Sequence, residues 1–373
     1  MQIKIKEVSS RRDLINFIKF PIRLYDGSPY YVPALIFDEI NTLDPKRNAA
    51  FQNCRAKYWL AYGDGKIVGR VAAILNTKHI EKWKQAYVRF GWLDFIDDAA
   101  VSAALLGAVE AYAKENGSQA VHGPLGFTDL DREGMLIEGF DEMGTLATNY
   151  NYPYYPEHMA RLGYQKDVDW VEYEIKPPTD PNEKISTLAK TVLKRNELSL
   201  LITRNRKQLM AYSQQIFQLI NEEYAHLYGT IVLSEKQITQ YIQQYFNFVD
   251  TELVPLVLDK HDKVIAFGIA MPSLSEALIK CRGRLLPLGW MHLLRALHVN
   301  DRADLYLVAI SKAYQGKGVN AVLMDAMIKA FIKRGIRLVE SNPELENNLQ
   351  VQTQWKSFDQ RLHKRRRCYI KEL

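Results

Sequence analysis

The sequence has few cysteines and no long hydrophobic run. Its three cysteines, Cys54, Cys281 and Cys368, are odd in number and far apart, which excludes a disulfide framework and a Cys-x-x-Cys metal site. No stretch approaches the roughly 20 apolar residues that a membrane-spanning helix requires. The first residues alternate polar and apolar side chains and contain no apolar block of a secretory signal. We therefore expect a cytoplasmic protein.

The net charge is only +6, but the charges are unevenly distributed: one part of the chain has few bases and another has few acids. Residues 94–142 contain eleven acids and two bases. The C-terminal segment is the reverse and contains a basic cluster of Arg361, Lys364, Arg365, Arg366 and Arg367. Short basic runs are usually solvated faces, and no nucleic-acid-binding motif accompanies this one. We therefore do not expect a nucleic-acid partner.

The chain has 373 residues, which is too many for a single ordinary hydrophobic core and suits two domains of roughly 180 residues each. Residues 176–183 are rich in proline and polar side chains, as linkers are. We predict an N-terminal unit at 1–176, a linker and connecting segment at 177–199, and a C-terminal unit at 200–373.

The two units share one pattern. Each contains two apolar runs around a polar turn, at 58–74 and again at 253–271, which indicates a β-hairpin. Each hairpin is followed by a strand, a helix that ends at a glycine, and a further strand. These elements are 87–96, 99–114 and 119–122 in the N-terminal unit, and 304–310, 319–333 and 336–340 in the C-terminal unit. The order predicts an α+β fold with a mixed, mostly antiparallel sheet flanked by helices in each unit.

A glycine-rich turn connects a strand to a helix in the C-terminal unit. Its residues, which follow the apolar run 305–310, are Gln315, Gly316, Lys317, Gly318, Val319 and Asn320. Backbone amides at a helix N-terminus have no partner within the helix, and the helix dipole adds partial positive charge. The glycines let a ligand approach the backbone closely. The turn therefore predicts a phosphate- or pyrophosphate-binding site.

This turn resembles the acyl-CoA pyrophosphate loop of the GNAT (N-acetyltransferase) superfamily, Gln-x-x-Gly-x-(Gly/Ala). Gln315 and Gly318 match, and Asn320 stands where glycine or alanine is usual. The resemblance covers about residues 200–372 and implies that residues 315–320 bind acyl-CoA, with acetyl-CoA the first expectation, as the acyl donor. The N-terminal unit is similar by layout only, and the whole chain resembles bacterial tandem GNAT-like proteins. The corresponding loop of the N-terminal unit carries Asp97 and Asp98 and no glycine. Because these carboxylates would repel a pyrophosphate, we expect no acyl-CoA there.

The resemblance also implies a mechanism. In the family the fourth strand splays from the fifth, and an N–H of that strand polarises the thioester carbonyl. Here that strand would offer Val308, Ala309 and Ile310 to the pantetheine arm. Asp304 and Glu340 are the candidate bases for the amine proton, each weighed against a solvated strand-end acid.

The sequence indicates the acid that protonates the leaving thiolate less clearly than it indicates the candidate bases. Family members often place a tyrosine seven residues after an asparagine in the last helix, and counting from Asn348 gives Trp355 here. Because an indole cannot serve as that acid, we assign the role to Tyr306, Tyr314 or a water, or expect unassisted departure.

The acidic segment 122–142 is long and rich in glycine, and long loops in compact domains are often functional. Asp129, Asp131 and Glu138 are candidates for binding a cationic amine acceptor, with solvated loop acids as the alternative. The glycine and closing glutamate of a calcium loop are misplaced, so we expect no metal.

The C-terminal unit carries an insertion at 273–299 that is rich in leucine with arginine and lysine interspersed. One interpretation is a flap over a long acyl chain, or an amphipathic segment in peripheral contact with a membrane. The other, which we favour at this point, is a helical excursion that buries its leucines against the domain.

These observations predict an acyltransferase that moves an acyl group, foremost acetyl, from acyl-CoA to a primary amine of a small molecule by direct attack. A second hypothesis is a long-chain N-acyl amino acid synthase that uses acyl-CoA or acyl carrier protein. A third is a non-catalytic acyl-CoA sensor or scaffold, which the departures at Asn320 and Trp355 favour.

Overall fold

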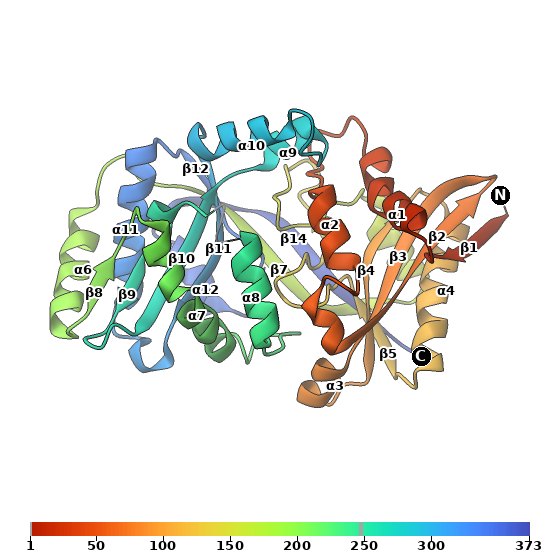
Figure 1. Ribbon diagram of the computed structural model, residues 1–373, viewed down its shortest axis with the longest axis horizontal. Coiled ribbons are helices and arrows are strands. Elements are labelled where there is room, and N and C mark those ends of the chain that lie inside the picture. The colour runs from red at the N-terminus through yellow and green to blue at the C-terminus, as the bar shows by residue number, and fades with distance from the viewer. Residues whose placement is uncertain (1, 246–248) are drawn as a thin grey trace.

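A computed structural model describes residues 2–245 and 249–373. Within these residues the strands form one sheet of 14 strands in the order β1-β2-β3-β4-β5-β14-β7-β12-β11-β10-β9-β8, with β6 and β13 attached to β14 and β7. Helices flank the sheet in both units (Figure 1). Neighbouring strands are mostly antiparallel, which confirms the predicted α+β class. No helix among the described residues is long and apolar enough to cross a bilayer.

The elements of the N-terminal unit are β1 (Ile3–Glu7), α1 (Arg11–Leu24), α2 (Ile36–Leu43), β2 (Cys54–Gly63), β3 (Lys66–Asn76), α3 (Thr77–Trp83), β4 (Tyr87–Phe95), α4 (Ala99–Glu115), β5 (Ala120–Gly123), β6 (Met135–Glu138), α5 (Tyr154–Arg161) and β7 (Gln165–Lys176). Those that follow are α6 (Glu183–Arg195), β8 (Ser199–Leu201), α7 (Arg206–Glu223), α8 (Glu235–Tyr245), β9 (Leu256–Leu258), β10 (Val264–Pro272), α9 (Ser275–Cys281), α10 (Gly289–His298), β11 (Arg302–Ile310), α11 (Val319–Arg334), β12 (Leu338–Glu340), β13 (Glu344–Leu345), α12 (Leu349–Trp355) and β14 (Asp359–Glu372).

The repeated pattern read from the sequence is present in both units. The hairpins are β2–β3 and β9–β10, each antiparallel, and β4–β5 and β11–β12 are the parallel pairs that follow. The predicted helices are α4 and α11. Gly117 and Gly335, after their last turns, have φ of +68° and +67°, the left-handed conformation that ends a helix without a Cβ clash.

The two units exchange their last strands. β14, from the end of the chain, lies between β5 and β7 of the N-terminal unit. β7 in turn pairs with β12 of the C-terminal unit. The long β7–β14 pair therefore stands between the two halves (Figure 1), and neither unit completes its sheet without the other. The division at 176 and 200 describes the sequence repeat, while the sheet itself is shared.

The C-terminal basic cluster lies on β14 and pairs with acids of the exchanged strand β7. Lys364 and Arg366, both fully buried, each form an ion pair with Glu172. Burial alone would raise the pKa of Glu172, but the charges of Arg366 and Lys364 outweigh it and lower that pKa to about 2. Arg367 pairs with Asp169 at 2.7 Å. These bases hold the shared strands together.

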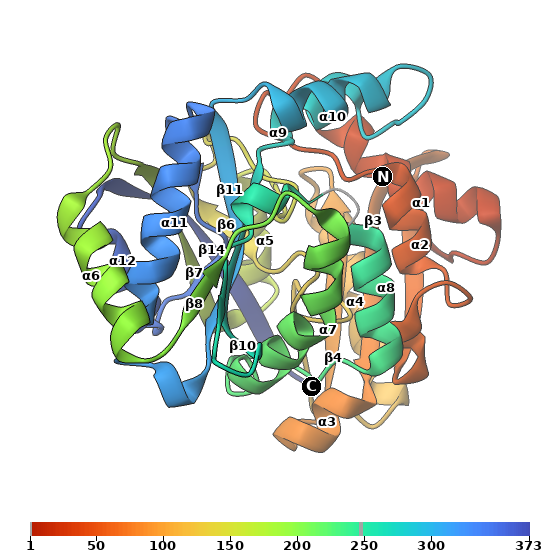
Figure 2. The ribbon, with the colours of Figure 1, turned by 60° about the vertical axis from the view of Figure 1, so that its left-hand side comes forward.

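The segment 177–199 is largely helical, because it contains α6, which packs against α11. The insertion 273–299 forms α9 and α10, which run along one edge of the molecule (Figures 1 and 2). Leu274 and Leu278 in and before α9 are buried, as the excursion interpretation predicts. In α10 only Gly289 is fully buried; Leu293 and Leu297 are partly buried and pack against the core of the C-terminal unit, whereas Leu294 is exposed.

Candidate active site

The predicted pyrophosphate loop joins β11 to α11. The chain forms a 3₁₀ turn at Lys312–Tyr314, and α11 begins at Val319. Gly316 and Gly318 have φ of +72° and +83°, which glycine adopts without strain. No side chain caps the first amides of α11, so these N–H groups are available to an anionic ligand.

Neighbouring elements fix the shape of this loop. Gln315 Nε2 donates to the carbonyl of Ile310 at 3.0 Å and to Glu223 Oε2 at 2.9 Å. The other oxygen of Glu223 accepts a backbone N–H of the 3₁₀ turn at 2.8 Å. A Cβ on Gly318 would lie 3.0 Å from Val192 of α6. Glu223 and Val192 therefore shape the loop, and no sequence signal had marked them.

β11 parts from β12 beside the loop. The two strands pair only from Arg302 to Asp304, and further along a register shift against β10 leaves Tyr306 as the extra residue of a β-bulge. The side chain of Val308 is 37% exposed. Its N–H donates to the Tyr224 hydroxyl at 3.3 Å, and that hydroxyl donates to its carbonyl at 3.0 Å. The splay leaves backbone groups of β11 outside the sheet's own pairing.

The other residues predicted to bind the donor surround this splay. Ala309 and Ile310 continue the pairing of β11 with β10. The Nζ of Lys317 lies 5.1 Å from the ring centroid of Tyr314. Asn320 is exposed on the first turn of α11 and lines a cavity that begins here.

This cavity has a volume of about 1390 Å³ and is lined by both units. Tyr306 and Val308 of β11 form one part of its wall, and apolar side chains of α11 continue it. α10 contributes apolar side chains as well: Trp290, Leu293, Leu294 and Leu297. The N-terminal unit contributes acids: Asp38 and Glu39 of α2, and three of the acidic segment 122–142, namely Asp129, Asp131 and Glu133. The splayed strand, the insertion and the acidic segment thus meet at one space.

The three acids differ in their partners. The carboxylate of Asp131 accepts the N–H groups of Phe127 at 2.7 Å and Thr128 at 3.1 Å. One oxygen each of Asp129 and Glu133 is buried with no hydrogen-bond partner among the described residues. Burial raises the pKa of all three, that of Asp131 to about 6 and that of Glu133 furthest. The charge of Arg89 opposes this rise in all three, but none of them forms an ion pair within the described residues.

Glu138 lies apart from this cavity, since it is exposed on β6 and pairs with Arg365 at 3.4 Å. Its predicted role in binding the amine acceptor stays a prediction, and it is not one of the acids that line the cavity. Arg132 lines the cavity beside the three acids, and its Nε–H donates to the carbonyl of Leu146 at 3.0 Å.

The two predicted bases line a separate pocket of about 20 Å³. Burial, followed by the charge of Glu340, raises the pKa of Asp304 to about 7. Glu340 itself is engaged by His363 and Lys364, each at 2.7 Å. Tyr306 is different, because it lines the large cavity; its hydroxyl interacts with the Asp304 carboxylate, and burial followed by the Asp304 charge raises its pKa. The catalytic roles of all three stay predictions.

A carboxyl group that the sequence analysis did not select lies on the cavity wall. Glu344 of β13 accepts the indole N–H of Trp355 on Oε1 at 2.7 Å, and its buried Oε2 has no hydrogen-bond partner in the described part of the chain. Burial raises its pKa to about 7. The tryptophan that replaces the family's tyrosine therefore positions an acid.

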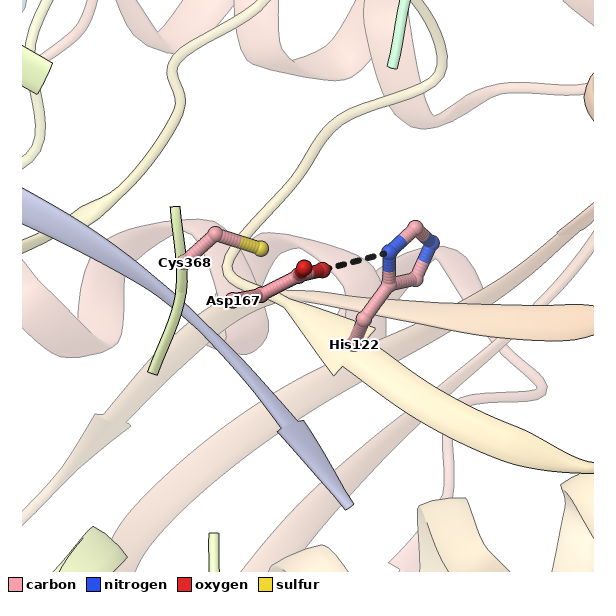
Figure 3. Close-up of side chains that lie close together, drawn as sticks. All are labelled: His122, Asp167 and Cys368. Carbon is pink, nitrogen blue, oxygen red and sulfur yellow. Dashed lines mark ion pairs between the residues drawn. The ribbon is translucent and has the colours of Figure 1, made fainter. Parts of the chain in front are cut away.

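A second polar cluster joins three neighbouring strands. Figure 3 shows His122 of β5, Asp167 of β7 and Cys368 of β14 close together. The hydroxyl of Tyr228 lies 3.2 Å from His122 Nδ1 and 3.4 Å from Cys368 Sγ, and it donates to Asp167. Burial lowers the pKa of His122 and raises that of the thiol. A protein hydroxyl thus occupies the place between these groups, which argues for a structural network.

Known proteins resemble this arrangement. Residues 213–352 match the Acetyltransferase (GNAT) family model. Protein YghO of Escherichia coli strain K12 is 28% identical over 376 residues, which cover 99% of this chain and 95% of that protein. A protein of Caulobacter vibrioides named Bacterial ceramide synthase is 24% identical over 334 residues, covering 88% and 85%.

Solved structures agree on the fold. A tandem GNAT protein from the clavulanic acid biosynthesis pathway superposes with a TM-score of 0.57 at 11% identity, over 100% of this chain and 98% of that one. A GCN5-related N-acetyltransferase from Sphaerobacter thermophilus gives 0.52 at 11% identity, over 99% and 95%. Residues 213–352 therefore form a GNAT-family domain, and the chain as a whole has the fold of tandem GNAT proteins.

Proposed function

We propose that this protein is an N-acyltransferase that moves an acyl group from acyl-CoA to an amine, with the donor bound at β11 and α11. The observation that carries the proposal is the uncapped N-terminus of α11 at Gly318 beside the splay of β11, where the described hydrogen bonds of the Val308 backbone go to the Tyr224 hydroxyl, which a ligand can displace. Amides at a helix N-terminus suit a pyrophosphate, and the nearby strand suits the pantetheine arm.

The chemistry is direct attack. The amine nitrogen bonds to the thioester carbonyl carbon, the C–S bond breaks, and an amide and a free thiol result. The N–H of Val308, now paired with the Tyr224 hydroxyl, would donate to the carbonyl oxygen as negative charge develops there. A preorganised donor of this kind contributes about 3 kcal/mol to transition-state stabilisation.

Glu344 is the base that we favour for the amine proton. It lines the cavity, has an unpartnered oxygen, and is held by Trp355. Its raised pKa, about 7, suits a general base near neutral pH. Asp304 and Glu340 lie off the cavity, and Tyr306 stays the candidate that returns a proton to the thiolate.

The cavity supports a long-chain substrate over acetyl alone. Its volume of about 1390 Å³ exceeds the roughly 300–1,000 Å³ of ordinary ligand pockets, and its α10 and α11 walls are mainly apolar. A ceramide is the amide of a fatty acid and a long-chain amino alcohol, so the name of the Caulobacter relative is compatible with such a substrate. We therefore infer long-chain N-acyl transfer, with Asp129 and Asp131 facing the ammonium of the acceptor.

Two measurements test the proposal. Calorimetry with acetyl-, octanoyl- and palmitoyl-CoA should give saturable binding that is tightest for palmitoyl-CoA. A free-thiol release assay against a panel of amines should then give turnover. Binding without turnover on any amine would favour the sensor hypothesis, and no binding of any acyl-CoA would overturn the donor site.

A further inference from the structure

The turn before α10 and the helix itself expose a large apolar face. Leu286 and Leu288 are 78% and 60% exposed, and Met291 is 51% exposed. Trp290 and Leu294 are also largely exposed. Phe37 of α2 is exposed as well, and the residue before it, Ile36, donates its N–H to the Gly283 carbonyl of the insertion. Contiguous apolar surface of this kind marks an interaction site.

The same segment is strongly one-sided in charge. Residues 277–300 contain Lys280, Arg282, Arg284 and Arg295 and no aspartate or glutamate. Lys280 pairs with Glu276 and Arg282 with Asp26. Arg284 and Arg295 form no ion pair within the described residues. A partner with negative charge and an apolar interior therefore complements this surface.

The apolar face continues into the cavity. Trp290 and Leu294 are exposed to solvent and also line the cavity, and Leu293 and Leu297 on the same helix line it as well. A hydrocarbon chain that lies against the outer face of α10 can therefore pass along these side chains to the cavity, which also contains Glu344.

We propose that residues 284–299 dock on an anionic lipid bilayer, with the leucines inserted among the acyl chains and the arginines at the headgroups. A short helix with apolar side chains on one face and flanking basic residues binds lipid surfaces in this way. The cavity then opens toward the membrane. An acidic carrier protein would satisfy the arginines, but it would not need the exposed Leu286, Leu288 and Met291.

Cosedimentation of the full-length chain with vesicles tests the proposal. Vesicles of phosphatidylcholine with phosphatidylglycerol should bind the protein in low salt, and pure phosphatidylcholine vesicles should bind it less. The double variant Leu286→Ser and Leu288→Ser should partition about a hundredfold more weakly, since two inserted leucines are lost. Arg284→Glu with Arg295→Glu should remove the preference for phosphatidylglycerol.

The matched control is a second double variant, Leu188→Ser on α6 with Leu349→Ser on α12, which changes two leucines that are exposed elsewhere on the protein. It should bind vesicles like the wild type. Equal loss in both leucine variants, no vesicle binding by the wild type, or stable binding of an acidic carrier protein through α10 in place of vesicles would overturn the proposal. No acyl-CoA is present in this assay, so a failure of the donor site leaves its outcome unaffected.

Discussion

The two units place equivalent elements around a bulged strand, and only one of them leaves that strand open. In the N-terminal unit the bulge on β4 falls at Trp92, which has φ +46°, and Arg70 pairs with Asp94 across β3 and β4 at 2.7 Å. In the C-terminal unit the bulge falls at Tyr306, and the exposed Val308 follows it. The buried Arg70–Asp94 ion pair thus fills the space beside the bulge of β4, and the equivalent space beside the bulge of β11 stays free.

Tyrosines mark the same difference. Tyr25 and Tyr224 are the C-caps of the equivalent helices α1 and α7. The Tyr25 hydroxyl donates to the carboxylate of Asp94, whereas that of Tyr224 bonds only to the backbone of Val308 in the contacts described. Tyr155 also blocks β4, because its hydroxyl accepts the N–H of Phe95 at 2.9 Å.

The helix N-termini differ in the same sense. Asp98 caps α4, accepting the N–H of Ala100 at 2.8 Å and that of Val101 at 3.3 Å. Gly318 caps α11 without any side chain. An intramolecular carboxylate thus takes the amides that a pyrophosphate would need in the N-terminal unit. The comparison suggests that a duplicated fold can lose a ligand by supplying its contacts from within.

The largest expected effect comes from Gly318→Glu. This change adds negative charge where we propose that the pyrophosphate binds, requires a left-handed φ of a residue with a side chain, and places Cβ 3.0 Å from Val192. Calorimetry should detect no CoA binding. Gly335→Glu, at the other end of α11 with open space around it, is the matched control and should bind like the wild type. Equal affinity in both variants would contradict the loop assignment.

Glu344→Gln should lower turnover about 100- to 10,000-fold with acyl-CoA affinity unchanged, because it removes the general base that we propose. The wild-type rate should rise as pH increases through about 7, where Glu344 loses its proton, and the variant should lack this rise. A steady-state pH profile with an amine acceptor measures both effects.

Asp304→Asn is the control for Glu344, since its pKa is also about 7 but it lies off the cavity. Turnover should fall far less than in Glu344→Gln, and the rise of rate through about pH 7 should remain, although Asp304 interacts with the Tyr306 hydroxyl. The folded state keeps a proton on Asp304 that the unfolded chain releases between pH 3.8 and 7, so this residue's contribution makes stability fall as pH rises across that window. Above pH 7 the variant should therefore resist urea better than the wild type. A large rate loss in this variant alone would return the role to Asp304.

Asp94→Ala should lower the free energy of unfolding by about 3–5 kcal/mol, because it leaves the buried Arg70 without a partner. Urea unfolding measures this loss. Calorimetry should still give one CoA per chain, since Asp98 continues to cap α4. A second binding event would show that the ion pair alone excludes the ligand.

Asp98→Ala should have the smallest effect, about 1 kcal/mol less unfolding free energy from the lost cap. CoA affinity should not change, because we place donor binding in the C-terminal unit alone. A change in affinity would contradict the division of labour between the units.

Local patterns in the sequence predicted the elements well, because hairpins, capped helices and the glycine loop are set by nearby residues. The exchange of β7 and β14 could not be predicted this way, since it pairs strands almost 200 residues apart, such as Arg366 beside Trp170. The basic cluster on β14 was a trace of it, but its partners Asp169 and Glu172 on β7 lie outside the acidic segment that the sequence marked. Glu344 was missed because β13 has two residues and no periodicity, and its burial depends on Trp355 and the cavity.

Hydrogen–deuterium exchange on the full chain, with and without saturating CoA, tests the difference between the units most directly. The account predicts slower exchange at residues 306–310 and 316–321 and no change at 94–101. Protection at 94–101, or none at 316–321, would contradict it.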